Sequence, residues 1–196
     1  MNINKFTKNS IEAVQNCEKL AYEYGNQMMD QEHLLLALLQ LDDSLISKLI
    51  EKMEIDLEHF TDNVINAVGR ISKVKGGNLY YSQDLNKALV SAEDELKIMG
   101  DEYVSVEHLF LTLLKYPNKA LKALFNEYGI TRERFLQALS TVRGNQRVVS
   151  DNPEATYDTL NKYGEDLVEK ARNQKLDPVI GRDSEIRNII RILWRK

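Results

Sequence analysis

The feature that most constrains the fold is an internal repeat, because the first two thirds of the 196-residue chain match themselves at a constant shift of 75 residues. The block FTKNSIEAVQNCEKLAYEYGNQMMDQEHLLLALL corresponds without a gap to YSQDLNKALVSAEDELKIMGDEYVSVEHLFLTLL. The triplet Glu32-His33-Leu34 thereby matches Glu107-His108-Leu109. A self-match of this length indicates two copies of one supersecondary unit that share a core. We therefore predict a domain with internal pseudo-twofold symmetry, with repeats at about residues 1–75 and 76–143.

Each copy shows the apolar period of a helix and no sustained alternation, so every element is predicted to be helical. Thr7 and Ser82 are expected to cap the first helix of each copy, and Gly25 and Gly100 to end it. The helices expected in the first copy are residues 7–24, 31–41, 44–53 and 57–71, with the same four 75 residues later. The fold class is therefore all-α, with two pseudo-symmetric four-helix repeats.

The other helix starts are assigned from the same kind of residue. The third helix of the first copy is expected to be capped by Asp42 or Asp43. The remaining predicted N-caps are Asp30, Asp56, Ser105, Asn118 and Thr131.

The apolar period that indicates helices ends after Val142. The polar run RGNQRVVSDNPEAT has no period and predicts a linker over residues 144–156. Helices are expected over residues 157–173 and 184–196, separated by Pro178. The last helix has an apolar face and no core of its own, so we interpret residues 157–196 as the beginning of a further domain. Its arginine stripe also fits a membrane, partner or nucleic-acid helix, and this alternative predicts strongly salt-dependent binding.

Composition excludes several classes of protein. The net charge is −4, so the basic footprint of a nucleic-acid binder is absent. The longest apolar run is the six residues 34–39, far below the roughly 20 that cross a bilayer, and the amino terminus lacks the apolar core of a signal peptide. Cys17 is the single cysteine, which excludes an intrachain disulfide. We expect a cytoplasmic protein without membrane or nucleic-acid partners.

The sequence shows no catalytic constellation. His33, His59 and His108 are not spaced with other ligands as a metal site requires, and neither a G-x-S-x-G motif nor a G-x-x-x-x-G-K-[ST] phosphate loop occurs. Cys17 lies inside a predicted helix where the other copy has Ala92, so we interpret it as a small core residue. We expect no enzyme activity, cofactor or metal in this chain.

The repeated blocks EHLLLALL and EHLFLTLL resemble the Clp amino-terminal domain of Clp/heat-shock-100 chaperone ATPases. The run from Arg143 to Leu193 resembles the junction at which ClpB-type disaggregases pass through a linker into their first AAA+ module. Its segments YGEDL and LDPVIGRDSEIR are the most specific part of the match. The resemblance covers essentially the whole chain. After the ClpB type, the ClpC type of Clp ATPase is the next most similar.

The resemblance implies a Clp amino-terminal domain at residues 1–143, a linker at 144–156 and an AAA+ entry segment at 157–196 that stops before Walker A. Val179 and Ile180 match the segment that lies against adenine in the family, but they need a phosphate loop to hold a nucleotide. The family parent would be a hexameric ATPase that uses ATP and magnesium and cooperates with an Hsp70-type chaperone. The fragment itself is expected to be a monomer.

The function implied by the resemblance is recognition of unfolded or aggregated polypeptides for an ATP-dependent disaggregase. By the same resemblance the substrate-binding residues are Thr7, Asp101 and Glu107. Each residue also has a structural explanation: Thr7 can cap a helix, Asp101 follows the stop at Gly100, and Glu107 lies in a first helical turn that favours a carboxylate.

The ClpC type implies an alternative function. In that type, the glutamates of the two EHL blocks recognise phosphorylated arginine, and the domain docks adaptors of a Clp protease. Glu32 and Glu107 occupy the matching positions. Two carboxylates on symmetry-related helices could accept hydrogen bonds from a guanidinium group.

Overall fold

The computed structural model describes residues 3–74, 77–144 and 147–153, together with positions 182, 187–188 and 190–192. The chain divides into two units, Met1–Asp158 and Thr159–Lys196. The expected helix at 157–173 and the predicted adenine contacts Val179 and Ile180 lie outside the described residues. Of the last expected helix, the described positions 187–188 and 190–192 are helical and exposed.

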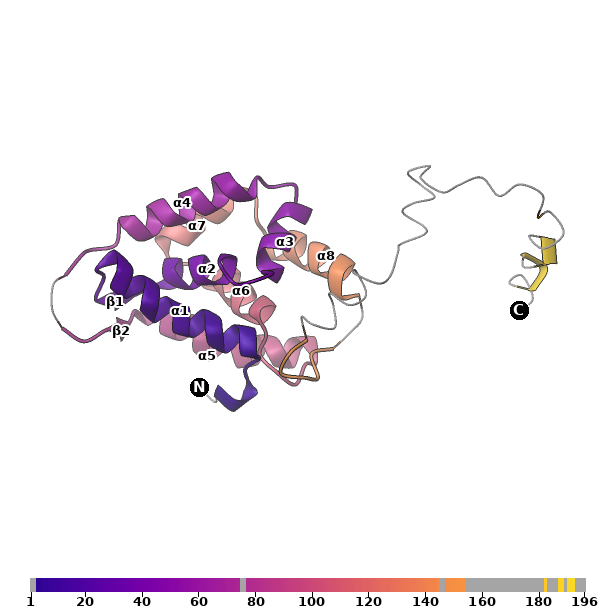
Figure 1. Ribbon diagram of the computed structural model, residues 1–196, viewed down its shortest axis with the longest axis horizontal. Coiled ribbons are helices and arrows are strands. Elements are labelled where there is room, and N and C mark those ends of the chain that lie inside the picture. Colours follow the sequence, from indigo (N-terminus) through magenta and orange to yellow (C-terminus); the bar gives the residue numbers. More distant parts are fainter. Residues whose placement is uncertain are drawn as a thin grey trace. The chain divides into compact units, whose positions relative to one another are not determined.

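The first unit contains two repeats of four helices (Figure 1). A short 3-10 helix, Ile3–Lys5, comes first. The observed helix ends agree with the expected ones to within three residues. The elements of the first repeat are α1 (Lys8–Tyr24), β1 (Met28–Met29), α2 (Gln31–Leu39), α3 (Leu45–Lys52) and α4 (Leu57–Gly69), and those of the second are β2 (Tyr80–Tyr81), α5 (Gln83–Met99), α6 (Val106–Lys115), α7 (Lys119–Glu127) and α8 (Arg132–Arg143).

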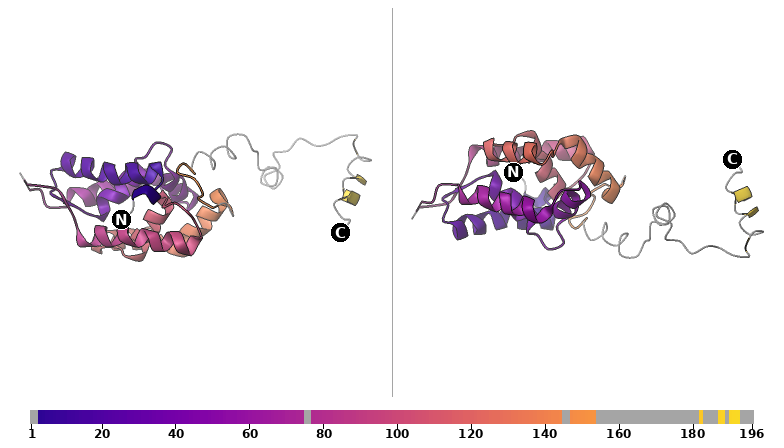
Figure 2. Two further views of the ribbon diagram at one scale, coloured as in Figure 1. Left: turned by 90° about the horizontal axis from the view of Figure 1, so that it is seen from below. Right: turned by 90° about the horizontal axis from the view of Figure 1, so that it is seen from above.

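The two repeats form two layers, which are seen edge-on in Figure 2. Helices α2 and α6 lie at the centre and contact each other. All nine residues of α2 are buried, and α6 is buried from Val106 to Leu113. A helix that is surrounded on every side must be apolar all round, which explains the runs LLLALL and LFLTLL. Among the described residues, no helix is long and apolar enough to cross a membrane.

Both predicted stops of the first helices are confirmed. Gly25 and Gly100 adopt left-handed conformations with φ of 71° and 70°, and their backbone N–H groups bond to carbonyls of the preceding turn. An L residue with a side chain is strained in this region, whereas glycine is not.

The predicted cap of α3 is wrong. Ser44, not Asp42 or Asp43, is the N-cap: its Oγ accepts a bond from the Ser47 N–H at 3.2 Å and donates to the Leu38 carbonyl at 2.6 Å. Asp43 has a left-handed φ of 55° and pairs with Lys48 instead. The helix cap thus lies one residue after Asp43.

The expectation that every element is helical also needs a correction. Strands β1 and β2 pair in parallel, with Met28 opposite Tyr80 and Met29 opposite Tyr81. They join the two repeats at one end of the domain (Figure 1). Two residues are too few to show the alternating pattern from which strands are predicted.

Residues 147–153, which the sequence assigns to the linker, lie against the domain; we call this segment the strap. The Glu102 N–H donates to the Val148 carbonyl and the Lys8 N–H donates to the Asp151 carbonyl, both at 2.9 Å. Val148 is completely buried. Residues 147–153 of the predicted linker are therefore docked on the domain.

We predict that Ser44→Ala lowers the free energy of unfolding by about 1 to 2 kcal/mol, because the part-buried Ser47 N–H and the buried Leu38 carbonyl lose a partner. Asp42→Ala, the matched control, is expected to change it by less than about 0.5 kcal/mol. Urea unfolding followed by circular dichroism measures both. A larger loss in Asp42→Ala than in Ser44→Ala would contradict the cap assignment.

Candidate functional site

The candidate site is built from the polar first turns of α2 and α6, which the fold buries. His33 and His108 are the third residues of these helices and close equivalent capping boxes. The ring Nδ1 of His33 accepts from the Asp30 N–H at 3.1 Å, and that of His108 accepts from the Ser105 N–H at 3.0 Å. In each neutral ring the proton therefore lies on Nε2. Burial lowers the pKa of His33, which favours this neutral form.

The partner of the histidine Nε2 distinguishes the two repeats. His33 Nε2 is 3.1 Å from Asn26 Oδ1, and His108 Nε2 is 3.0 Å from Asp101 Oδ2. Asn26 and Asp101 are equivalent residues of the repeat. The second contact is within hydrogen-bonding distance but poorly aligned, so it acts mainly as an electrostatic contact. The first repeat thus contains a neutral pair where the second has a charged one.

Asp101 is the centre of a buried charged cluster. Its Oδ1 accepts bonds from the Arg143 guanidinium and from the Val148 N–H, the latter at 2.9 Å. Burial by itself raises the pKa of Asp101, but the contacts with His108, Arg143 and Val148 outweigh it and lower the pKa to about 2. The carboxylate of Asp101 is therefore ionised at neutral pH.

Glu107 completes this cluster from the first turn of α6. It is fully buried, and its Oε1 lies 3.4 Å from Nη1 of Arg143. Its Oε2 has no hydrogen-bond partner among the described residues. We call Asp101, Glu107, His108 and Arg143 the second-repeat cluster. Arg143 neutralises one of its two carboxylates and shares its charge with the other.

Glu32, the equivalent of Glu107, has a different environment. Its Oε2 accepts a bond from Asn118 Nδ2 at 2.9 Å, and no cation pairs with it among the described ion pairs. Burial and the nearby charge of Asp30 raise the pKa of Glu32 to about 6. This carboxyl group changes its charge within the physiological range.

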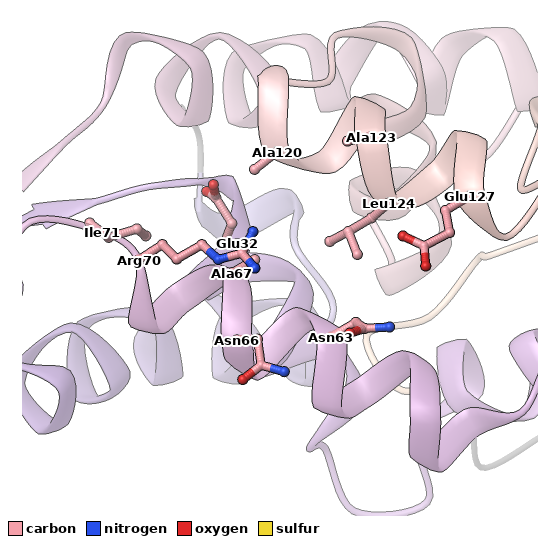
Figure 3. A pocket seen from close by; sticks show the side chains of 10 residues that line it. All are labelled: Glu32, Asn63, Asn66, Ala67, Arg70, Ile71, Ala120, Ala123, Leu124 and Glu127. Carbon is pink, nitrogen blue, oxygen red and sulfur yellow. The ribbon is translucent and has the colours of Figure 1, made fainter.

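Glu32 lies at a pocket of about 270 Å³ between α4 and α7 (Figure 3). Small side chains leave the space open on both helices, and two further charged groups, Arg70 and Glu127, lie on its wall. The lining residues are Glu32, Asn63, Asn66, Ala67, Arg70, Ile71, Ala120, Ala123, Leu124 and Glu127. The pocket combines an anionic and a cationic group, so it can hold a polar ligand that carries both charges.

A second and more open groove, of about 460 Å³, lies beside the second-repeat cluster; we call it the α5–α8 groove. Its apolar floor is formed by Met99 at the end of α5 and by Leu136 and Leu139 of α8. Arg143 separates it from the buried carboxylates, and Arg147 of the strap lies on its edge. The remaining lining residues are Ser140 and Gly144.

The structure brings two of the three predicted substrate-binding residues together and places the third nearby. Asp101 and Glu107 share Arg143. Thr7 is buried and caps α1, where its Oγ1 accepts from the Ser10 N–H at 3.3 Å. These contacts match the structural explanation of each residue, and their role in substrate binding stays a prediction.

Sequence reasoning missed two residues that shape this region. Arg143 stands where the first repeat has Val68, and Glu95 stands where it has Leu20. Glu95 is fully buried and pairs with Lys115 at 3.0 Å and Arg132 at 2.7 Å. Burial alone raises the pKa of Glu95, but these two cations outweigh it and lower the pKa. The sequence offered one signal for both residues: each is charged at a position that is apolar in the other repeat.

The described residues contain no group of side chains arranged to hold a metal ion. Cys17 is buried, and burial raises the pKa of its thiol, so it stays protonated. The interpretation of Cys17 as a small core residue is confirmed.

Comparison with known proteins identifies the family of this repeat. Residues 5–128 match the family described as the Clp repeat (R) N-terminal domain. The chain belongs to this family. The expected all-α fold with two repeats is thereby confirmed.

Curated relatives carry the name chaperone protein ClpB. The chain is 44% identical over 202 residues to the protein of Nitratidesulfovibrio vulgaris and 43% identical over 201 residues to that of Bacillus anthracis. Each alignment covers 100% of this chain and 23% of the relative, so the chain spans about a quarter of the length of these proteins.

Solved structures share the fold. The Hsp104 N-terminal domain of Candida albicans has a TM-score of 0.67 and 23% identity, covering 75% of this chain and 97% of its own. A complex of the ClpV N-domain with a VipB peptide has a TM-score of 0.58 and 22% identity, covering 70% of this chain and 86% of its own.

We predict that Glu32→Gln stabilises the domain by about 1 to 2 kcal/mol at pH 7.5 and has little effect at pH 4. The folded-state pKa of about 6 lies above the 4.5 of a free glutamate side chain, so stability is lost as the pH rises through 6 and this carboxyl ionises. Glutamine cannot ionise and keeps an oxygen for Asn118. Urea unfolding at both pH values measures the difference, with exposed Glu51→Gln as the control. An equal gain at both pH values would contradict the pKa shift.

Proposed function

We propose that this domain is the receptor through which a ClpB-type, ATP-dependent disaggregase recognises unfolded or aggregated polypeptides. Membership of the Clp repeat family and the ClpB names of relatives at 43% and 44% identity support the class of protein. The observation that carries the proposal is the α5–α8 groove. It is apolar at its floor and open to solvent, and it adjoins two residues assigned to substrate binding by resemblance.

The groove suits a receptor that accepts many sequences. Its apolar floor favours aliphatic and aromatic side chains without fixing their order, and Met99 can adapt its shape to different ligands. Each contact is weak, because the floor is formed by only three apolar side chains. Several tethered copies in a hexameric parent would raise the effective affinity by multivalency.

In our proposal, ATP hydrolysis takes place in the AAA+ modules of the full-length protein and not in this domain. ATP and magnesium would be bound by these modules, with Val179 and Ile180 near adenine, and an Hsp70-type chaperone would deliver aggregates. The isolated chain would be a monomer without ATPase activity, located in the cytoplasm.

We predict that Leu136→Asp weakens binding of an unfolded polypeptide about tenfold, because a carboxylate on the groove floor loses apolar contact and is desolvated by the ligand. Leu136 is only half-buried, so the fold should tolerate the change. Val90→Asp is the matched control, since Val90 is 56% exposed on α5 and does not line the groove.

Fluorescence anisotropy with labelled, reduced and carboxamidomethylated lactalbumin measures both variants, and folded lactalbumin is the negative ligand. If Leu136→Asp and Val90→Asp lowered the affinity for unfolded lactalbumin equally, the groove would not be the binding site. Equal binding of folded and unfolded lactalbumin would remove the receptor function itself.

A second candidate function is the recognition of phosphorylated arginine residues. The pocket between α4 and α7 favours this function at Glu32. This pocket holds Glu32 for a guanidinium group and Arg70 for a phosphate (Figure 3). The equivalent carboxylate Glu107 is fully buried against Arg143. Of the two predicted tag-binding glutamates, Glu32 alone lines this pocket.

If this second function holds, phosphoarginine affinity increases from pH 5 to pH 7, because Glu32 with a pKa of about 6 becomes a carboxylate over that range. Glu32→Gln should then weaken binding about tenfold or more, whereas exposed Glu58→Gln on α4 should not. NMR titration with free phosphoarginine at both pH values tests this. Signals that shift at Glu107 and not at Glu32 would contradict the assignment.

A further inference from the structure

The strap, residues 147–153, is held on the domain by groups that any extended polypeptide could satisfy. Asp101 Oδ1 accepts the Val148 N–H, the Glu102 N–H donates to the Val148 carbonyl, and the Lys8 N–H donates to the Asp151 carbonyl, each at 2.9 Å. On the strap side all three bonds use the main chain. They therefore select an extended backbone and not a particular sequence.

Two residues of the strap, Val148 and Pro153, are buried. Val148 is 0% exposed, while the next residue, Val149, is 60% exposed, which is the alternation of an extended segment. Val148 is buried yet does not belong to the main hydrophobic core of the domain. We call the buried place that Val148 occupies its socket.

The other strap contacts are weak. Lys8 Nζ and Asp151 Oδ2 are 3.3 Å apart, but their side chains are 68% and 56% exposed, so solvent screens the pair. The Lys8 N–H belongs to the first turn of α1, which has no partner within the helix and needs an external acceptor. Another carbonyl could take the place of Asp151 without any loss on the domain side.

The position of the strap links it to both regions assigned to substrate. Its first residue, Arg147, lies on the edge of the α5–α8 groove, and its socket is next to Asp101. Its far end reaches Lys8, the residue after Thr7. A segment that replaced the strap would thus contact the neighbours of Thr7 and Asp101 and open one side of the groove.

We propose that the seat of the strap is itself a polypeptide-binding site, that its ligand is an extended segment of an unfolded chain carrying a small branched apolar residue, and that the strap occupies the site as an internal competitor. This inference rests on the proposed receptor function. It explains how the buried Asp101 can take part in substrate binding: it holds the strap in the free domain and would hold a substrate segment in the bound one. Release of the strap would be the step that couples substrate capture to the chain beyond residue 153.

The test uses the full 196-residue chain and labelled, reduced and carboxamidomethylated lactalbumin. Val148→Ser removes the fully buried apolar side chain of the strap, and exposed Val149→Ser is its control. Since an internal competitor reduces the apparent affinity by the fraction of open sites, Val148→Ser should lower Kd about three- to tenfold. Val149→Ser should leave Kd within about twofold of the original chain.

A second pair of variants avoids any change in the socket. Asp151→Lys repels Lys8 and should also tighten binding, while Asp42→Lys makes the same charge change at an exposed position away from the strap. In the unaltered chain, saturating lactalbumin should move the NMR signals of the Val148 methyl groups towards solvent-exposed values.

The outcomes separate the two proposals. Binding by the unaltered chain with no gain in Val148→Ser and Asp151→Lys, or with unchanged Val148 signals, would overturn the competitor role and leave the receptor function standing. Absence of binding by the original chain and by every variant would overturn the receptor function and, with it, this inference.

Discussion

The structure depends on the burial of two helix amino termini inside the domain. Helices α2 and α6 lie at the centre, so the N–H groups of their first turns cannot be satisfied by water. His33 and His108 solve this problem in the same way, because each Nδ1 accepts the backbone N–H three residues earlier. This use fixes the ring tautomer and demands an acceptor beside Nε2. The polar network of each repeat is built outward from that requirement.

The two repeats then diverge in charge, and this asymmetry gives each half a different surface. In the first repeat the acceptor is the neutral Asn26, and among the described ion pairs none includes Glu32, which lines an open pocket with Arg70. In the second, Asp101 brings a buried charge that requires Arg143, and Arg143 in turn covers Glu107. One ancestral pattern thus yields a small polar pocket on one side and an open apolar groove on the other.

The proposed receptor must bind many different polypeptide sequences although its core is rigid, and this arrangement would allow it to do so. The α5–α8 groove and the strap lie at the surface of the second repeat, whereas α2 and α6 are buried at the centre of the domain. In our inference, a ligand would take over the main-chain bonds that hold the strap. Substrate capture and the release of the chain towards the motor would then be one event, because both involve residues 147–153.

The sequence by itself determined the repeat, the eight helices and most of their caps, because apolar period and capping are local properties of neighbouring residues. Only the tertiary structure decided that Ser44 caps α3, that Glu32 is open while Glu107 is covered, and that residues 147–153 dock. Each of these outcomes depends on partners far away in the chain, such as Arg143 for Glu107. Contacts between residues that are distant in the chain determine the charge and exposure of the site residues, and no local sequence pattern encodes such contacts.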